Sequence, residues 1–223
     1  MKLDGVIFDL DGTLGDTLPV CFTAFRRAMT GFSQRCYSDE EISALFGPSE
    51  EGIIRRLVPE RWQACLKAYL EAYAEEFAKS ARVFPGIETA LRLLKKRGVA
   101  LAIVTGKGAE SAAISLRHLG LVGFFDIVET GSPDGSVKPL AIKRVLAKWG
   151  AAPDRVAYVG DAPTDIEAAR EAGVVPLGAA WAATSSADIL GALSPLETFR
   201  SIEDFAWWVE KNVESLPGRR SSS

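Results

Sequence analysis

Residues 3–13 read LDGVIFDLDGT, and this stretch decides the fold of the 223-residue chain. Residues 3–10 form a short apolar run with few polar interruptions, and residues 11–13 are Asp-Gly-Thr, which is typical of a turn. The pattern predicts a buried strand that enters a tight turn. It also places Asp9 and Asp11 at the end of that strand, where a sheet presents side chains to a ligand.

Helix and strand patterns alternate from residue 83 onward. Apolar runs predict further strands at 99–105, 125–128, 155–159 and 174–177. Helices are predicted between them at 87–97, 110–119, 140–149 and 164–172. A glycine follows each of these helices, as is common at helix ends. The alternation predicts an α/β fold with a parallel sheet.

Residues 17–82 break this alternation, because they show helical periodicity and no strand run. Helices are predicted at 20–29, 39–46, 50–57 and 61–79. We therefore expect a catalytic core of residues 1–16 and 83–215, with an all-helical cap of residues 17–82 inserted after the first strand. A last helix at 202–213 should dock onto the core through Phe205, Trp208 and Val209, and the tail 216–223 is predicted to be disordered.

The charge balance excludes a general attraction to polyanions. Lys and Arg total 26 against 29 Asp and Glu, a formal charge of −3, so neither nucleic acid nor an anionic membrane is an expected partner. The first residues resemble neither a signal peptide nor a membrane span, so we expect a cytoplasmic protein. Whether it is a monomer or a homodimer stays open.

Polar residues gather just beyond the predicted strand ends. They are Asp9, Asp11, Thr105, Gly106, Lys138, Asp161 and Asp165. In an open parallel sheet, ligands bind beyond the carboxyl ends of the strands, so we expect these residues to converge. Four carboxylates at one edge repel one another unless a hard cation such as Mg²⁺ neutralises them, and Mg²⁺ commonly binds a substrate phosphate as well. The pattern predicts a magnesium and phosphate site.

The chemistry suggests a role for each residue. Asp9 suits the nucleophile, and Asp11 suits the acid that protonates the leaving oxygen and later the base that activates water. The Thr105 hydroxyl and Lys138 are expected to neutralise the phosphoryl charge.

Backbone groups complete the predicted phosphate site. Gly12 lets the chain turn and expose backbone N–H groups. Gly12, Thr13 and Gly106 are the predicted substrate-binding residues.

Four segments together resemble the signatures of the haloacid-dehalogenase-like hydrolases, in the family's order. They are FDLDGT at 8–13, VTG at 104–106, VKP at 137–139 and GDAPTD at 160–165. The resemblance implies a Rossmann-like core with a helical cap, an aspartyl-phosphate intermediate, and Mg²⁺ held by Asp9, the backbone carbonyl of Asp11, and Asp161. Asp165 would orient Lys138 or a metal-bound water. Asp-Thr at 16–17 and Phe-Gly-Pro at 46–48 make the capped phosphoglycolate-phosphatase-like branch the most similar one.

Within this resemblance a phosphatase acting on a small phosphorylated metabolite is predicted, with a sugar phosphomutase as the alternative. Dehalogenases lack the acid at the position of Asp11, and mutases carry a histidine where this chain has Cys21. A phosphoacceptor signalling module and a non-catalytic phospho-ligand binder are the alternatives from other classes. Nine basic and nine acidic residues in 17–82 leave the natural substrate open.

Overall fold

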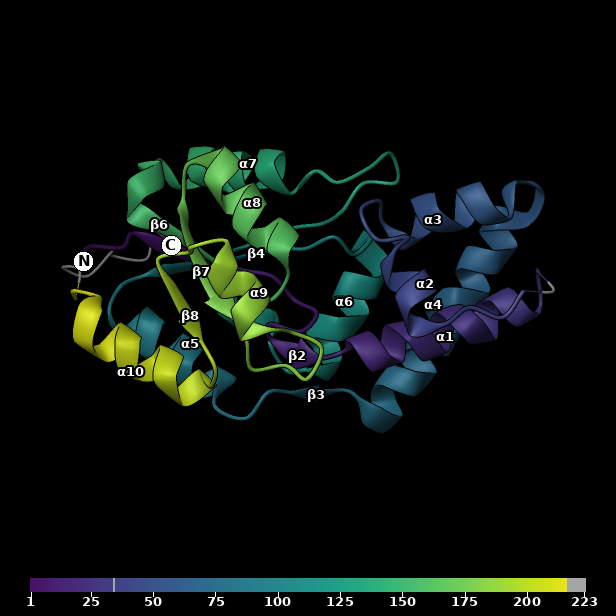
Figure 1. Ribbon diagram of the computed structural model, residues 1–223, viewed down its shortest axis with the longest axis horizontal. Helices are drawn as coiled ribbons and strands as arrows, with labels where there is room; N and C mark the ends of the chain where they lie inside the picture. Colours follow the sequence, from purple (N-terminus) through teal and green to yellow (C-terminus); the bar gives the residue numbers. More distant parts are fainter. Residues whose placement is uncertain (34, 216–223) are drawn as a thin grey trace.

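A six-stranded parallel sheet forms the centre of the computed structural model, which describes residues 1–33 and 35–215 (Figure 1). The strand order is β5-β4-β1-β6-β7-β8, and every neighbouring pair is parallel. The strands are β1 (Gly5–Phe8), β4 (Ala100–Val104), β5 (Ile127–Glu129), β6 (Val156–Gly160), β7 (Val175–Ala179) and β8 (Glu197–Phe199). The predicted α/β class is confirmed, and the predicted tail 216–223 lies outside the described residues.

Helices cover both faces of the sheet, because its central strands are apolar on both sides. The helices of this region are α5 (Ile87–Lys96), α6 (Ala109–His118), α7 (Lys138–Trp149), α8 (Pro163–Ala172), α9 (Ala187–Ala192) and α10 (Ile202–Asn212). Helices α5 and α10 pack together, as do α7 and α8. Along β1, Val6 and Phe8 join the hydrophobic cluster that includes α5 and α10, whereas Ile7 joins the cluster of α7 and α8. This alternation is the two-residue period of a strand.

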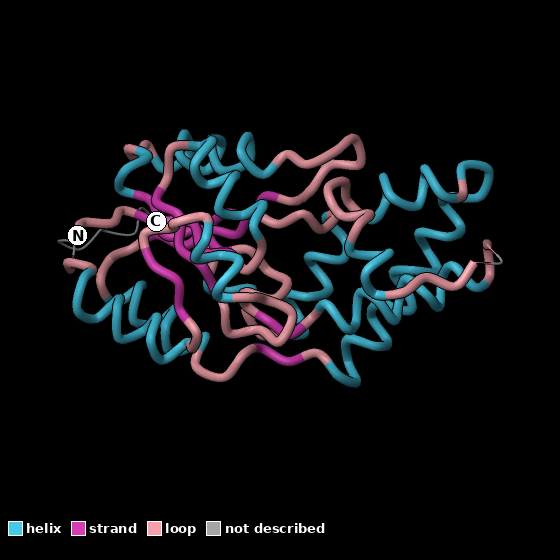
Figure 2. The backbone as a smooth tube through the Cα atoms, in the orientation of Figure 1, coloured by secondary structure: helices cyan, strands magenta, loops and turns pink. Residues whose placement is uncertain are grey.

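Four further helices form an insertion between two short strands. Strand β2 (Gly15–Asp16) pairs antiparallel with β3 (Arg82–Val83). Between them lie α1 (Leu18–Thr30), α2 (Asp39–Ser43), α3 (Glu50–Leu57) and α4 (Trp62–Ser80). We call these four helices the helical insertion. They lie together at one end of the molecule, away from most of the sheet, and the chain enters and leaves them through the β2–β3 ribbon (Figures 1 and 2).

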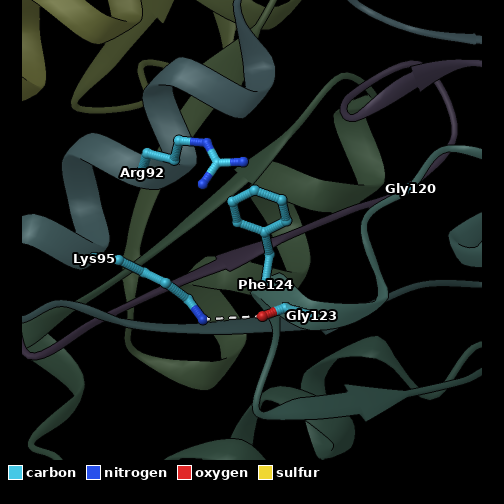
Figure 3. Close-up of a pocket in the computed structure, with 5 residues that line it drawn as sticks. All are labelled: Arg92, Lys95, Gly120, Gly123 and Phe124. Carbon is cyan, nitrogen blue, oxygen red and sulfur yellow. Dashed lines mark hydrogen bonds between the residues drawn. The ribbon is translucent and has the colours of Figure 1, made fainter.

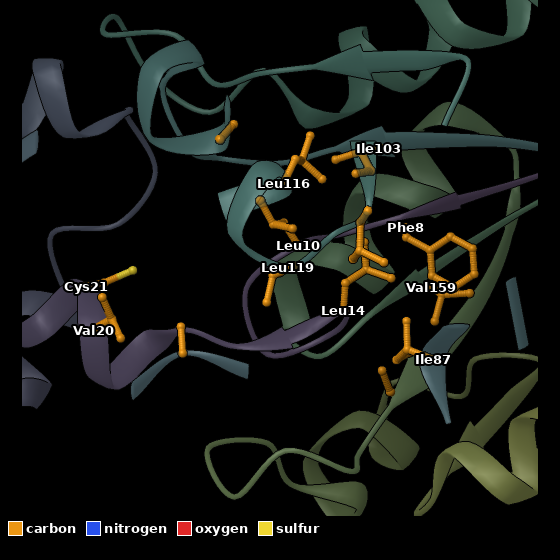
Figure 4. Close-up of a cluster of buried hydrophobic side chains, with 14 of the residues drawn as sticks. Phe8, Leu10, Leu14, Val20, Cys21, Ile87, Ile103, Leu116, Leu119 and Val159 are labelled. Carbon is orange, nitrogen blue, oxygen red and sulfur yellow. The ribbon is translucent and has the colours of Figure 1, made fainter. Parts of the chain in front are cut away.

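The hydrophobic interior runs continuously from the sheet into the insertion. Figure 4 shows Phe8 on β1, Leu116 and Leu119 at α6, and Val20 and Cys21 on α1 as parts of one buried cluster. Helix α6 lies between the sheet and the insertion (Figure 1). The Tyr73 hydroxyl of α4 is 2.9 Å from the Ser115 hydroxyl of α6. The insertion therefore packs against the core through α6.

Three small features are not predicted by the sequence pattern. Strand β8 has three residues and an exposed Glu197, so it shows neither a long apolar run nor clear alternation. Helix α9 spans six residues, and the β2–β3 ribbon pairs only two residues on each side. Elements this short depend on tertiary packing rather than on a periodic pattern.

Among the helices of the described residues, none combines the length and apolar character needed to cross a membrane.

Helix α10 docks onto the sheet through aromatic contacts, as its sequence predicts. The Phe205 ring is fully buried, with ring centroids 6.0 Å from Phe8 and 5.3 Å from Phe199. Trp208 packs on Phe199 at 5.6 Å, whereas Trp207 is 61% exposed. Because only one face of α10 is buried, the exposed Trp207 can serve as a control for the buried Phe205.

We predict that Phe205→Ala lowers the free energy of unfolding by about 3–5 kcal/mol, because it leaves a cavity between α10 and the sheet. Trp207→Ala should change it by less than about 0.5 kcal/mol, since an exposed ring loses few contacts. Urea titrations followed by circular dichroism measure both values. Equal losses in the two variants would contradict this docking of α10.

Candidate active site

The carboxyl ends of three central strands bring the predicted site residues together. Strand β1 lies between β4 and β6, with Phe8 opposite Ile103 on one side and Val159 on the other. Asp9, Thr105 and Asp161 each follow one of these strands by one position and are buried. The pairing of β1 with both neighbours is thus what gathers residues from three distant motifs.

The acidic cluster of Asp9, Asp161 and Asp165 is the centre of the site. Each offers a carboxylate oxygen within 4.8 Å of the others. The Lys138 ammonium at the start of α7 lies 3.2 Å from Asp9 Oδ1 and donates to Asp165 Oδ1 at 2.6 Å. Asp165 also accepts from the Tyr158 hydroxyl at 3.2 Å. Lys138 therefore bridges the predicted nucleophile and the residue predicted to orient the lysine.

Burial sets the protonation behaviour of this cluster. Burial raises the pKa of Asp9 to about 7, and the charge of Asp165 adds to the rise, while Lys138 opposes it. The pKa of Asp161 is raised well above its usual range by burial and by the charges of Asp165 and Asp9. Burial lowers the pKa of Lys138, but the two neighbouring aspartates outweigh it and the pKa is raised. One ammonium is not enough to neutralise three buried carboxylates.

The donor set fits a hard divalent cation. Among the side chains of residues 1–33 and 35–215, Asp9 Oδ1 is a buried oxygen that accepts no hydrogen bond, although the Lys138 ammonium lies 3.2 Å from it as an ion pair. Asp161 faces Asp9 across the strand end with its charge only partly compensated, by the Thr13 hydroxyl at 2.9 Å from Oδ1. Carboxylate oxygens in this arrangement are the ligands that Mg²⁺ prefers. Asp9 and Asp161 are thus positioned to hold a metal ion.

Both the backbone conformation at position 12 and the nearby Asp161 carboxylate favour glycine there. Its φ is 72°, in the left-handed region that favours glycine. A Cβ at this position would lie 2.2 Å from Asp161 Oδ2, so any other residue would displace the Asp161 carboxylate. The glycine therefore lets the loop after β1 reach the carboxylate after β6.

The Thr13 hydroxyl contacts Asp161 in this structure. The sequence predicts a substrate contact, but the side chain is fully buried and its hydroxyl donates to Asp161. The indole N–H of Trp181 donates to the Thr13 carbonyl at 3.0 Å. The hydroxyl orients Asp161, and the substrate contact of Thr13 stays a prediction.

Thr105 and Gly106 lie at the end of β4 as expected. Thr105 is buried, and its hydroxyl oxygen accepts the Lys107 N–H at 3.3 Å, which leaves its own proton available to a phosphoryl oxygen. A Cβ on Gly106 would meet no atom of the described residues within 4 Å, so they leave space beside its backbone. This side of Gly106 therefore has room for a ligand.

Asp11 lies in a second group of side chains on the side of the insertion. The Thr17 hydroxyl donates to its Oδ1, and the Lys107 ammonium lies 3.3 Å from its Oδ2. Lys107 is in turn 3.6 Å from Glu50 on α3. The sequence pattern singles out neither Lys107 nor Glu50 as a site residue, although Lys107 stands two positions after Thr105 in the same strand-end loop.

A separate surface hollow is unrelated to this site. It is lined by Arg92, Lys95, Gly120, Gly123 and Phe124. Figure 3 shows the Arg92 guanidinium beside the Phe124 ring and Lys95 bonded to the Gly123 carbonyl. The hollow contains none of the predicted site residues, and its two cations are occupied by these contacts.

Comparison with known proteins identifies the family. The model of the haloacid dehalogenase-like hydrolases matches residues 6–179, which span the strand-end residues described above. The chain belongs to this family. A "probable phosphatase IndB" of Dickeya dadantii is 34% identical over 88% of this chain and 90% of its own length.

One further relative and one solved structure are also similar to the chain. A phosphoglycolate phosphatase of Synechococcus elongatus is 29% identical over 80% of this chain and 84% of its own length. The crystal structure of a "predicted phosphoglycolate phosphatase" from Haemophilus somnus superposes with a TM-score of 0.78 at 22% identity, covering 92% of this chain and 97% of that one. At that identity, the structural similarity shows that the two proteins share the α/β fold.

The raised carboxyl pKa values lead to a stability prediction. A carboxyl group whose pKa is raised by folding favours the folded state at low pH, and that advantage is lost as the pH rises through the folded pKa, about 7 for Asp9. Without metal, Asp161→Asn should therefore raise Tm near pH 8 by about 2–4 °C, which corresponds to about 1 kcal/mol in a chain of this size. Asparagine keeps an oxygen for Thr13 and removes a carboxyl group whose ionisation is opposed by burial and by the charges of Asp165 and Asp9.

Thermal unfolding with and without Mg²⁺ tests this prediction. Mg²⁺ should raise the Tm of the wild-type protein, more at about pH 8 than at about pH 5, and should have little effect on Asp161→Asn. Asp154→Asn, at an exposed position, is the control for lost charge. A metal-free Asp161→Asn protein less stable than wild type at pH 8, with an undiminished Mg²⁺ effect, would refute the assignment.

Proposed function

We propose that this haloacid dehalogenase-like chain is a Mg²⁺-dependent phosphatase that hydrolyses a small phosphomonoester through an aspartyl-phosphate on Asp9. The observation that carries the proposal is the contact of the Lys138 ammonium with Asp9, 3.2 Å apart at the end of β1. A carboxylate can attack phosphorus only where the negative charge of both partners is neutralised. The family membership and the phosphatase names of two relatives support the same chemistry.

Asp9 is proposed to attack the phosphorus, with phosphate oxygens held around it. Lys138 faces the transferred phosphoryl group while Asp165 fixes the lysine from behind. The Thr105 hydroxyl donates to a second phosphoryl oxygen, and the backbone N–H of Gly106 binds another. The Gly12 N–H instead closes the turn by donating to the Gly15 carbonyl at 3.0 Å. These groups are held by the sheet, so they need little rearrangement when charge develops.

Asp11 is proposed to move the proton in both half-reactions. It donates to the leaving oxygen as the aspartyl-phosphate forms and later accepts a proton from the water that attacks it. Dehalogenation needs no such acid, so the presence of Asp11 favours phosphoryl transfer. Asp9, the Asp11 backbone carbonyl and Asp161 would hold Mg²⁺, which when bound would neutralise the charge of the carboxylates and of the phosphate.

The helical insertion, residues 17–82, is proposed to act as a cap on a core of residues 1–16 and 83–215. Its α3 end touches the core, since the Ser49 N–H donates to the Ser132 carbonyl at 2.8 Å. A Cβ on Gly52 would lie 2.0 Å from the Pro133 carbonyl, so this contact is close. The β2–β3 ribbon would be the hinge, and closure would exclude water from the phosphoryl group.

The residue at the position of the mutase histidine gives the mutase alternative no support. Cys21 stands where the resemblance expects a mutase histidine, and its thiol accepts from Lys107 at 3.2 Å. Burial raises the pKa of Cys21 to about 12, so the thiol has no role as a proton carrier near neutral pH.

Cytoplasmic location and a monomeric or homodimeric state stay predictions.

We predict that Asp9→Asn lowers turnover by about three orders of magnitude or more while the fold survives, because the shape is kept and the nucleophile is lost. The assay measures inorganic phosphate released with Mg²⁺ from p-nitrophenyl phosphate and from a panel of phosphoglycolate, sugar phosphates and nucleotides. Asp154→Asn should retain wild-type rates, and excess chelator should abolish them. Near-normal turnover by Asp9→Asn, or by chelated protein with metal removal verified, would contradict the proposal.

A further inference from the structure

Lys107 is a buried lysine at the junction of the core and the helical insertion. It is 5% exposed, and its Nζ lies 3.3 Å from Asp11 Oδ2. Three groups from the insertion surround the same ammonium: Glu50 Oε1 at 3.6 Å, Cys21 Sγ at 3.2 Å and the Tyr73 ring, whose centroid is 4.4 Å away. Burial lowers the pKa of Lys107, but Asp11 and its other neighbours raise it well above its ordinary value, so the ammonium stays charged.

Glu50 ties this ammonium to the position of the insertion. Its Oε2 accepts the Gly108 N–H at 2.6 Å, and its Oε1 accepts the Ser111 hydroxyl at 2.6 Å. Both donors belong to the start of α6, where a carboxylate is favoured by the unpaired N–H groups of the helix. Glu50 from α3 therefore binds the core segment that carries Lys107.

The two oxygens of Asp11 are consequently held from two directions. The Thr17 hydroxyl, at the start of the insertion, donates to Oδ1, and Lys107 faces Oδ2. If the insertion moved away, Glu50, Cys21 and Tyr73 would leave Lys107, and the ammonium would be free to reorient. The orientation of Asp11 thus depends on the docking of the insertion.

We infer that Lys107 is a positioning residue that holds Asp11 in the orientation for proton transfer, and that Glu50 makes this orientation conditional on the docked insertion. The inference rests on the proposed function, because it concerns the acid of that reaction. A direct role in binding a second anionic group of the substrate is less consistent with the geometry. The ammonium is almost fully enclosed and already contacts two carboxylates and an aromatic ring.

The test exploits the different need of two leaving groups for an acid. The p-nitrophenolate of p-nitrophenyl phosphate leaves without protonation, whereas the alkoxide of an alkyl phosphate requires it. The measured quantity is the single-turnover rate of leaving-group release with enzyme in excess, which isolates formation of the aspartyl-phosphate from its hydrolysis. The alkyl ester is the one from the panel above that the wild-type protein releases fastest.

Lys107→Met, which keeps the length and loses the charge, should lower the alkyl rate by about ten-fold or more and change the p-nitrophenyl rate by less than about twofold. Glu50→Gln should also lower the alkyl rate, but by a smaller factor. In an Asp11→Asn background, Lys107→Met should add less than about twofold, because both act through one group. Lys143→Met, at an exposed position of α7, is the control for lost charge.

Each other outcome overturns the inference. Equal losses on both esters would mean that Lys107 only supports the local structure, and a raised KM at unchanged maximal rate would mean that it binds substrate. Additive losses in the Asp11→Asn background would show that Lys107 acts elsewhere. If Lys107→Met does not fold, a Glu50→Gln protein with an unchanged ratio of the two rates also overturns it. A wild-type protein that hydrolyses no ester refutes the proposed function first, so the two failures are distinguishable.

Discussion

The structure depends on one buried ionic contact, in which the Lys138 ammonium lies between Asp9 and Asp165. Three buried carboxylates at one sheet edge would destabilise the fold without a cation among them. Lys138 begins α7, and Asp165 lies in the first turn of α8, so the contact also fixes two neighbouring helices. The Tyr158 hydroxyl from β6 completes this support.

This cluster of charged side chains explains why glycines stand in two of the loops around the site. The loop after β1 must approach Asp161 so closely that only glycine fits at position 12, and the Thr13 hydroxyl donates to the same carboxylate. Gly160 is similarly confined, since a Cβ there would lie 2.4 Å from the Asp165 Cβ. The charged groups can therefore stay close enough to share a cation.

The sheet and most of the cluster were predictable because their signals are local. Apolar runs and helix-ending glycines locate the strands and helices to within a few residues, and Asp9, Thr105 and Lys138 stand directly at element ends. Lys107 and Glu50 were not predictable, because Glu50 lies on a helix of the insertion rather than at a strand end, and no local pattern shows how that helix docks beside Lys107. A hydroxyl such as that of Thr13 is equally ambiguous in sequence, since substrate and Asp161 are both acceptors for it.

The central claim is that Asp9 carries the phosphoryl group, and one measurement tests it most directly. Wild-type protein is mixed with Mg²⁺ and a radiolabelled phosphomonoester that it hydrolyses, quenched in acid within one turnover, and digested for peptide mapping. We expect label on the peptide that contains Asp9, released by hydroxylamine and missing from Asp9→Asn. Rapid phosphate release with no label on that peptide at any quench time would contradict the claim.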